Sequence, residues 1–233
     1  MLDDLREKAC RANLDLVRHG LVVLTFGNAS ACDRKAGIMA IKPSGLAHES
    51  LRPEDMVLVD LDGRVVEGRL RPSSDAPAHL ALYRAFDGVG GVCHVHSPAA
   101  TAFAQAGRPL PCLGTTQADY FPGPVPVTRL LRKREVEADY ERNTGRVIVE
   151  RFAGRPPLEM PAALVAGHGP FTWGRTAAEA VIHALVLEFA ARTALNTIRL
   201  NPGVRPLPAY LLRKHFERKH GPKAYYGQSK EKP

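Results

Sequence analysis

Hydrophobic positions recur at helical spacing in several parts of the chain, separated by glycine, proline and serine. Near the start, Leu5, Ala9, Ala12 and Leu16 form one apolar face, and Gly20 is a typical helix end. The longest helical pattern begins at Thr176, which forms a capping box with Glu179. The pattern predicts helices over residues 2–19, 71–86, 97–107, 176–195 and 208–221, the second of them after an opening turn, and the third with Ser97 as N-cap and Pro98 at its first position.

Short apolar or alternating runs predict the strands. The segment 163–174 reads as a strand, a glycine turn and a second strand, and residues 56–68 read as a hairpin. Segment 143–152 is ambiguous, because its β-branched residues favour a strand while Thr144 could cap a helix. Strands are predicted over 21–26, 37–42, 56–60, 64–68 and 91–96, with a loop opening at 27–30 and a proline-rich irregular stretch at 108–127.

Strands and helices alternate without an internal repeat or a break in composition, so we expect one α/β domain over residues 1–233. The 233 residues are 45% hydrophobic, and no apolar run approaches the roughly 20 residues of a membrane span. The first residues lack the apolar segment of a secretory signal. Four scattered cysteines without a CxxC pair fit free thiols in a reducing cytoplasm, which we expect to be the protein's location.

The net charge of +8 raises the question of nucleic-acid binding. However, the basic residues are spread along the chain, with modest clusters at 129–135 and 211–223, and match no recognition motif. A basic enzyme that acts on anionic substrates is the favoured interpretation, and we expect neither nucleic acid nor membrane as a partner.

Three histidines suggest a metal site. His94 and His96 flank one residue of a predicted strand, so their side chains should lie on the same face. His168 follows an apolar strand between two glycines, which allow close backbone approach. Asp75 is either a fourth ligand or a catalytic carboxylate. Three imidazoles with an open position fit a catalytic Zn²⁺, although the HxH pattern alone is weak, and Mn²⁺ or Co²⁺ would also accept such ligands.

Three short turns suggest a phosphate site. Residues 26–30, 42–45 and 71–75 place glycine or serine just after a strand or before a helix, where backbone N–H groups and hydroxyls can converge on an anion. Lys42 could add a positive charge. Each turn alone would be ordinary, but three of them near a possible metal indicate a phosphorylated ligand.

Taken together, these motifs resemble those of the L-ribulose-5-phosphate 4-epimerases in the class II aldolase/epimerase superfamily. The resemblance spans nearly the whole chain and rests on KPSG, RPSSDAPAH, GGVCHVHS, GTTQADYF, HGPFTWG and KHGPKAYYGQ, in this order. It implies a three-layer α/β/α fold around a mostly antiparallel sheet, with segment 143–152 helical. It also implies a homotetramer with active sites at subunit interfaces.

The resemblance further implies a role for each candidate residue. Asp119 and Tyr226 would form the acid/base pair, with the tyrosine reaching the site from a neighbouring subunit. The zinc ligands would be His94, His96 and His168 with Asp75 alongside, and the substrate contacts would be Gly27, Asn28, Lys42, Ser44, Gly45, Ser73 and Ser74.

The implied reaction is a metal-dependent epimerisation between L-ribulose 5-phosphate and D-xylulose 5-phosphate, through cleavage and re-formation of the C3–C4 bond. An aldolase of the fuculose-1-phosphate type is the nearest alternative, but there the carboxylate near the metal is typically Glu rather than Asp75. A non-catalytic binding protein is a further alternative. Two departures from the epimerase pattern are Gln117, where that family has His, and the proline-rich segment 122–126.

Overall fold

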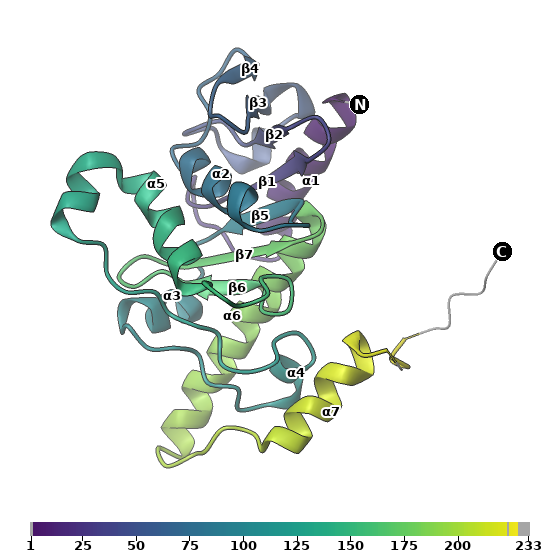
Figure 1. The fold of residues 1–233 in the computed structure, drawn as a ribbon, viewed down its shortest axis with the longest axis vertical. Coiled ribbons are helices and arrows are strands. Elements are labelled where there is room, and N and C mark those ends of the chain that lie inside the picture. Colours follow the sequence, from purple (N-terminus) through teal and green to yellow (C-terminus); the bar gives the residue numbers. More distant parts are fainter. Residues whose placement is uncertain (1, 223, 228–233) are drawn as a thin grey trace.

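A seven-stranded sheet forms the middle of the molecule in the computed structural model, which describes residues 2–222 and 224–227 (Figure 1). The strands lie in the order β4-β3-β2-β1-β5-β7-β6, and each neighbouring pair is antiparallel. Their bounds are β1 Asn28–Asp33, β2 Ile38–Ile41, β3 Val57–Asp60, β4 Val65–Glu67, β5 Gly91–His94, β6 Ala162–Leu164 and β7 Pro170–Gly174.

Helices cover both faces of this sheet, which confirms the three-layer α/β/α prediction. On one face, α2 and α5 pack against large residues of the strands, whereas α1 and α6 cover the other face. The helices are α1 Leu2–Arg18, α2 Ala76–Ala85, α3 Pro98–Gln105, α4 Thr115–Ala118, α5 Lys133–Arg151, α6 Ala177–Leu200 and α7 Ala209–His220, with 3-10 turns at His48–Ser50 and Pro53–Asp55.

The alternation of side chains along the strands explains the two cores. Met39 and Ile41 of β2 lie in the core under α2 and α5, while Ala40 between them lies in the core under α1 and α6. On the first face, Trp173 of β7 is fully buried and packs against Phe86 and other aromatic rings. Most bulky strand residues therefore point to the α2/α5 layer, and small ones such as Ala29, Ala31 and Ala40 allow α1 and α6 to approach closely.

Most predicted elements are present. The hairpin β3–β4, the pair β6–β7 and the five predicted helices all form, within a few residues of their expected ends. Thr176 caps α6 by accepting the N–H of Glu179, but the Glu179 carboxylate accepts from Arg175 instead of completing a capping box with Thr176. The ambiguous segment 143–152 is helical in α5, as the family resemblance implied.

The prediction of a strand at 21–26 and a loop at 27–30 was wrong. Residues 21–26 are irregular, Leu24 has a positive φ of 54°, and the side chains of Val23, Leu24 and Phe26 are exposed. The strand begins at Asn28, in a run of small residues that lies directly beneath α1. Hydrophobicity favoured the wrong segment, because Ala29 and Ala31 suit a central strand that a helix approaches closely.

The proline-rich stretch 108–127 is mostly irregular, as predicted, but contains the four-residue α4. This short helix packs against α7, which stands apart from the main body beside α4 (Figure 1). No residue of α7 is buried. By length and composition α6 could span a membrane, but the same holds for core helices of soluble proteins, and α6 packs along β5 and β7 of the sheet.

Candidate functional site

One cavity of about 350 Å³ collects nearly all the candidate residues. It lies where β1 and β2 meet the start of α2, the end of β5 and the β6–β7 turn. Thr25, Phe26 and Pro43 also line it, and the sequence interpretation did not include them. The predicted residues that line it are Gly27, Asn28, Lys42, Ser44, Gly45, Ser73, Ser74, Asp75, His94, His96 and His168.

The three histidines form a tight group in this cavity. One ring nitrogen of each lies within 4.8 Å of the others, and Nε2 of His94 is 3.1 Å from Nε2 of His96. Strand β5 ends at His94, so His96 lies just beyond it, yet the two rings still meet, with their centroids 4.7 Å apart. His168 comes from the β6–β7 turn.

The hydrogen bonds of this group suit a metal ion. His94 Nδ1 is 2.9 Å from the carbonyl of Pro170, which can only accept, so Nδ1 carries the proton and Nε2 presents a lone pair to His96. Burial and then the neighbouring imidazoles lower the pKa of His94 well below its ordinary value. Burial also lowers the pKa values of His96 and His168. Neutral imidazoles directed at a common point fit a divalent cation.

Glycines allow the backbone to approach these ligands. Gly27 has a φ of 83°, and a Cβ atom there would lie 2.8 Å from the carbonyl oxygen of His94. Gly167, with a φ of 73°, precedes His168, and a Cβ on Gly169 would lie 3.0 Å from the Val95 carbonyl oxygen. Gly169 therefore has the role that the sequence suggested, because it lets the turn approach the end of β5, while Gly167 supplies a positive φ that favours glycine.

Asp75 lines the cavity but lies outside the three-histidine group. It is the N-cap residue of α2, and its Oδ2 accepts a 2.7 Å hydrogen bond from Nδ2 of Asn28. The same amide group also contacts Ser73 Oγ at 3.1 Å. The bond from Asn28 fixes the orientation of the carboxylate, and both roles that the sequence left open, a fourth ligand or a catalytic carboxylate, stay predictions.

Lys42 and two serine turns form the other side of the cavity. The side chain of Lys42 is 2% exposed, makes only a 3.4 Å contact to the Pro43 carbonyl, and forms no ion pair with the described residues. Burial lowers its pKa. The turns are joined by backbone bonds from Ser44 N to Arg71 O and from Ser73 N to Lys42 O, so these amides are already engaged. Ser73 Oγ accepts from Asn28 Nδ2 and from the Asp75 amide but can still donate its own proton. A buried cation beside hydroxyls that can donate favours a bound anion.

Asp119 and Tyr226 lie outside this cavity. Asp119, at the end of α4, accepts hydrogen bonds from Nε of Arg218 at 2.8 Å and from His215 at 3.1 Å. Burial alone would raise the pKa of Asp119, but the bonds from Arg218 and His215 outweigh it and lower that pKa. Asp119 is therefore a carboxylate at neutral pH.

Tyr226 lies close to the same cluster. The guanidinium carbon of Arg218 is 4.8 Å from the centre of the Tyr226 ring, and Nζ of Lys219 is 4.4 Å from it. The tyrosine is 59% exposed. Asp119 and Tyr226 are thus brought together by α4 and α7, apart from the histidines.

The residues around Asp119 were missed by the sequence interpretation. His215, Arg218 and Lys219 follow the i, i+3, i+4 spacing of one helix face, and this signal could have revealed them.

Gln117, where the epimerase pattern has His, is 3% exposed, and its Nε2 has no partner among the described residues. In the proline-rich segment, Leu110 and Val125 exchange two backbone hydrogen bonds that hold this loop.

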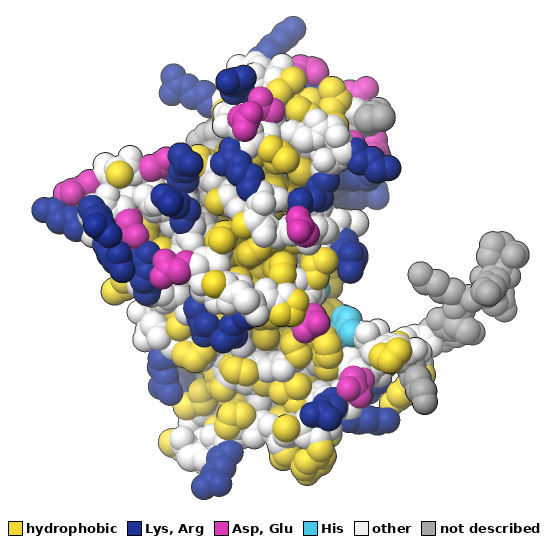
Figure 2. All heavy atoms as spheres, viewed as in Figure 1, with side chains coloured by type: hydrophobic (Ala, Val, Ile, Leu, Met, Phe, Trp, Pro, Cys, Tyr) yellow, Lys and Arg dark blue, Asp and Glu magenta, His cyan; other side chains and the backbone are white. Residues whose placement is uncertain are grey.

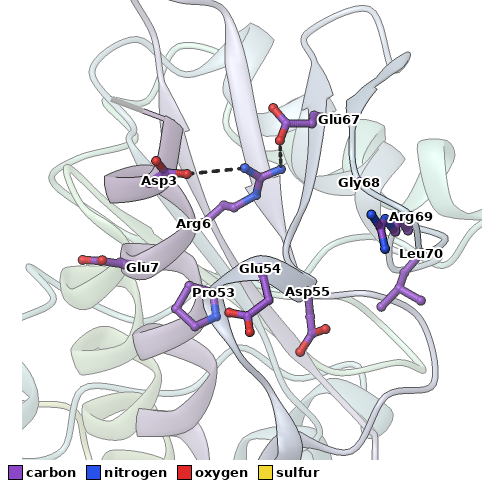
Figure 3. A pocket seen from close by; sticks show the side chains of 10 residues that line it. All are labelled: Asp3, Arg6, Glu7, Pro53, Glu54, Asp55, Glu67, Gly68, Arg69 and Leu70. Atoms are coloured by element: carbon purple, nitrogen blue, oxygen red, sulfur yellow. Dashed lines mark hydrogen bonds and ion pairs between the residues drawn. The ribbon is translucent and has the colours of Figure 1, made fainter.

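A larger cavity, of about 850 Å³, contains none of the candidate residues (Figure 3). Arg6 of α1 reaches into it and is paired with Glu67 at 2.8 Å and Asp3 at 3.7 Å. Its charged side chains come from α1, β4 and the adjoining loops. Arg6, the buried cation of this cavity, is already paired with carboxylates, whereas Lys42 in the smaller cavity has no such partner among the described residues.

Comparisons with known proteins agree with the geometry. The family described as "Class II Aldolase and Adducin N-terminal domain" matches residues 7–195. A protein of Salmonella paratyphi A (strain ATCC 9150 / SARB42) named "L-ribulose-5-phosphate 4-epimerase UlaF" is 53% identical over 227 residues, which cover 97% of this chain and 100% of that protein. The protein of the same name from Salmonella paratyphi C (strain RKS4594) is 52% identical over the same lengths.

Solved structures share the fold. An L-fuculose 1-phosphate aldolase is 25% identical, with a TM-score of 0.79, and the match covers 93% of this chain and 96% of that one. The L-fuculose-1-phosphate aldolase of Thermus thermophilus is 27% identical, with a TM-score of 0.63 over 88% of this chain and 98% of that one.

Proposed function

Because the chain belongs to the class II aldolase and adducin N-terminal domain family, we propose that it is an L-ribulose-5-phosphate 4-epimerase. It would interconvert L-ribulose 5-phosphate and D-xylulose 5-phosphate. The observation that carries the proposal is one cavity lined both by a three-histidine group and by the buried Lys42, which forms no ion pair with the described residues. The relatives named as this epimerase, at 53% identity, support the choice of substrate.

The chemistry of the substrate explains why a metal site is needed. The proton on C4 is not acidic, because the ketone is at C2 and C4 has only hydroxylated neighbours. Removal of the proton from the C4 hydroxyl instead allows the C3–C4 bond to break, with its electron pair passing into an enediolate of dihydroxyacetone. The other fragment is glycolaldehyde phosphate. Attack of C3 on the opposite face of the aldehyde then gives the epimer.

His94, His96 and His168 would hold the metal ion, with Asp75 beside it. We propose Zn²⁺, with Mn²⁺ or Co²⁺ as substitutes, since all three accept imidazole ligands. The ion would supply Lewis-acid stabilisation of the charge that develops on the enediolate. Asp75 accepts the amide hydrogen bond of Asn28, which fixes the orientation of its carboxylate.

Two groups on opposite faces of the C4 oxygen must exchange its proton. Asp119 and Tyr226 are the proposed pair. Asp119 is ionised at neutral pH because its pKa is lowered, so its carboxylate has room for a proton, and the phenol of Tyr226 carries a proton to donate. In the reverse reaction the two groups exchange roles.

The phosphate must stay bound while the aldehyde end of its fragment rotates. We assign this task to the Lys42 ammonium and the hydroxyls of Ser44, Ser73 and Ser74, with Gly27, Asn28 and Gly45 shaping the cavity. Lys42 supplies a charge that no described carboxylate neutralises. Hydrogen bonds to a charged partner of this kind contribute about 1.5–3 kcal/mol each.

The active site would be completed between subunits of a homotetramer. Within one chain, the metal group lies in the cavity at the sheet, whereas Asp119 and Tyr226 lie on α4 and after α7. Helix α7 has no buried residue, and Tyr226 is exposed, so this part of the chain is free to meet a second copy. Free thiols at all four cysteines and a phosphorylated substrate support a cytoplasmic location.

The test is to incubate the metal-loaded protein with L-ribulose 5-phosphate and to separate the products. We expect D-xylulose 5-phosphate without net release of glycolaldehyde phosphate, and no conversion after treatment with a chelator. Accumulation of the cleavage fragments would instead indicate an aldolase of the fuculose-1-phosphate type, the second candidate, which the structural neighbours favour. No reaction with metal present would leave a sugar-phosphate-binding protein.

Nucleic acid remains a poor candidate partner. Figure 2 shows Lys and Arg side chains spread over the visible face, mixed with acidic and hydrophobic ones, and not gathered into one stripe. Binding to a nucleic-acid backbone requires such a concentrated positive surface. The charge of +8 is better explained by anionic substrates.

A further inference from the structure

Tyr140 contacts the metal group although no sequence motif pointed to it. Its hydroxyl lies 3.3 Å from Nδ1 of His168, and the two rings are 6.0 Å apart, centre to centre. The tyrosine is 37% exposed and comes from α5, far from His168 in the sequence. It is the side chain that bridges α5 to the turn carrying the third histidine.

The backbone around Tyr140 is held firmly. Helix α5 breaks at Asp139, whose φ is −165° and ψ 83°, directly before the tyrosine. Asn143 spans the break with a 2.8 Å bond to the carbonyl of Glu135, and Thr144 bonds the Tyr140 carbonyl at 2.9 Å. The following turn packs so closely on α2 that a Cβ atom on Gly145 would lie 2.7 Å from the Ala78 carbonyl oxygen. The backbone position from which the Tyr140 side chain extends is therefore fixed.

The comparison with His94 shows what this contact does. The Pro170 carbonyl accepts from Nδ1 of His94 and leaves Nε2 facing His96. For His168, the Tyr140 oxygen occupies the equivalent position at Nδ1. A histidine that ligates metal through one nitrogen usually donates its other N–H to such an acceptor, which fixes the tautomer and the ring orientation.

We propose that Tyr140 is a positioning residue that accepts the Nδ1–H of His168 and directs Nε2 of that ring at the metal ion. The inference rests on the proposed metal site. The Tyr140 hydroxyl, and not only its ring, then contributes to the affinity for the metal. Tyr140 itself contacts neither the metal position nor the reacting carbon atoms in this assignment.

The Tyr140→Phe variant tests this inference in the absence of sugar. Removal of the hydroxyl should weaken Zn²⁺ binding about tenfold, measured by competition with a chromophoric chelator, because loss of such an outer partner typically costs 10–100-fold in affinity. The visible spectrum of the Co²⁺-substituted protein should also change. The melting temperature of the metal-free protein should match that of the wild type, while the stabilisation by added Zn²⁺ should be smaller.

Tyr210→Phe is the matched control, because Tyr210 is 76% exposed on α7. It should bind metal as the wild type does. If Tyr140→Phe binds Zn²⁺ with wild-type affinity and gives the wild-type Co²⁺ spectrum, the positioning role is overturned while the proposed function stands. A lower melting temperature of metal-free Tyr140→Phe would also overturn it in favour of a structural role. If the wild type itself binds no metal, the proposed metal site fails first.

Discussion

His94 lies on a central strand of the sheet, whereas Asp119 follows a four-residue helix that packs on α7. The cavity around His94 draws its residues from strands and turns that two helical layers hold in place. The cluster around Asp119 depends on α7, which has no buried residue. The proposed metal and phosphate residues are therefore held by the buried sheet, whereas the proposed acid/base residues lie on an exposed part of the chain.

Buried polar contacts strengthen this difference. Beneath the cavity, the Ser30 hydroxyl contacts Nδ1 of His79 at 2.7 Å and the Tyr83 hydroxyl at 2.8 Å, and all three residues are fully buried. This network ties α2, and hence Asp75 at its start, to β1. Around Asp119, the charged partners are partly exposed, so their ion pairs are screened by solvent. The buried residues around His94 and the partly exposed cluster around Asp119 are therefore expected to respond differently to substitution.

Removal of the metal should have the largest effect on activity. A chelator, or the His96→Ala substitution, should lower kcat by at least about 1000-fold, because the enediolate then loses its Lewis acid, which contributes several kcal/mol. Added Zn²⁺, Mn²⁺ or Co²⁺ should restore the chelated wild type but not the variant. Full activity in a preparation shown to be metal-free by elemental analysis would refute the metal-dependent mechanism.

Tyr226→Phe should lower kcat by roughly 100–10,000-fold, the usual range for loss of an acid/base group. Metal content and melting temperature should stay at wild-type values, since Tyr226 is exposed and lies apart from the histidines. Tyr225→Phe, one residue earlier and 63% exposed, is the matched control and should remain active. An unchanged kcat in Tyr226→Phe would remove Tyr226 from the acid/base pair.

Lys42→Met should mainly raise KM, by roughly 10–100-fold, since a hydrogen bond to a charged group contributes about 1.5–3 kcal/mol. The long apolar side chain fills the same buried space without the charge. Metal affinity should not change, because the one described hydrogen bond of the Lys42 ammonium goes to the Pro43 carbonyl and not to a metal ligand. A variant with wild-type KM would show that the phosphate is held elsewhere.

His79 should make the free energy of unfolding depend on pH. Burial lowers the pKa of His79 to about 3, so the native ring stays neutral while the unfolded chain takes up a proton near pH 6.5. Its contribution to the free energy of unfolding is therefore complete above pH 6.5 and falls by roughly 1.4 kcal/mol per pH unit as the pH drops toward 3.

The His79→Gln variant should show a correspondingly smaller slope of unfolding free energy against pH in this window. Denaturant titrations of the wild type and the variant, both metal-free, would measure the difference. Equal slopes would mean that His79 is protonated in the native state or is not a source of the pH dependence.

The sequence was most informative where chemistry follows local spacing. The HxH pattern placed His94 and His96 on one side, and the glycines around His168 indicated the close approach that the structure has. The strand register that brings His168 to His94 is a long-range property, and no local pattern in the sequence indicates it. The hydrophobic run 21–26 was misleading, because its side chains are largely exposed near the cavity while small residues form the strand.

Contacts between distant segments could not be read from the chain. The Tyr140 contact with His168 depends on the break in α5 at Asp139, which no sequence pattern signalled. The burial of Lys42 depends on how two turns are joined by backbone bonds. The partners of Asp119 lie almost one hundred positions further along the chain, on α7. Each of these depends on packing, which local periodicity does not encode.

Subunit mixing tests most directly the claim that the site is divided between chains. His96→Ala and Tyr226→Phe subunits, each inactive alone, would be unfolded and refolded together in equal amounts. We expect recovery of about a quarter of wild-type activity, because a quarter of the interfaces in random tetramers then pair an intact metal group with an intact tyrosine. A mixture of His96→Ala with Asp119→Asn should recover in the same way if both acid/base residues come from the neighbour. No recovery in tetramers proven to contain both subunits would contradict a shared site.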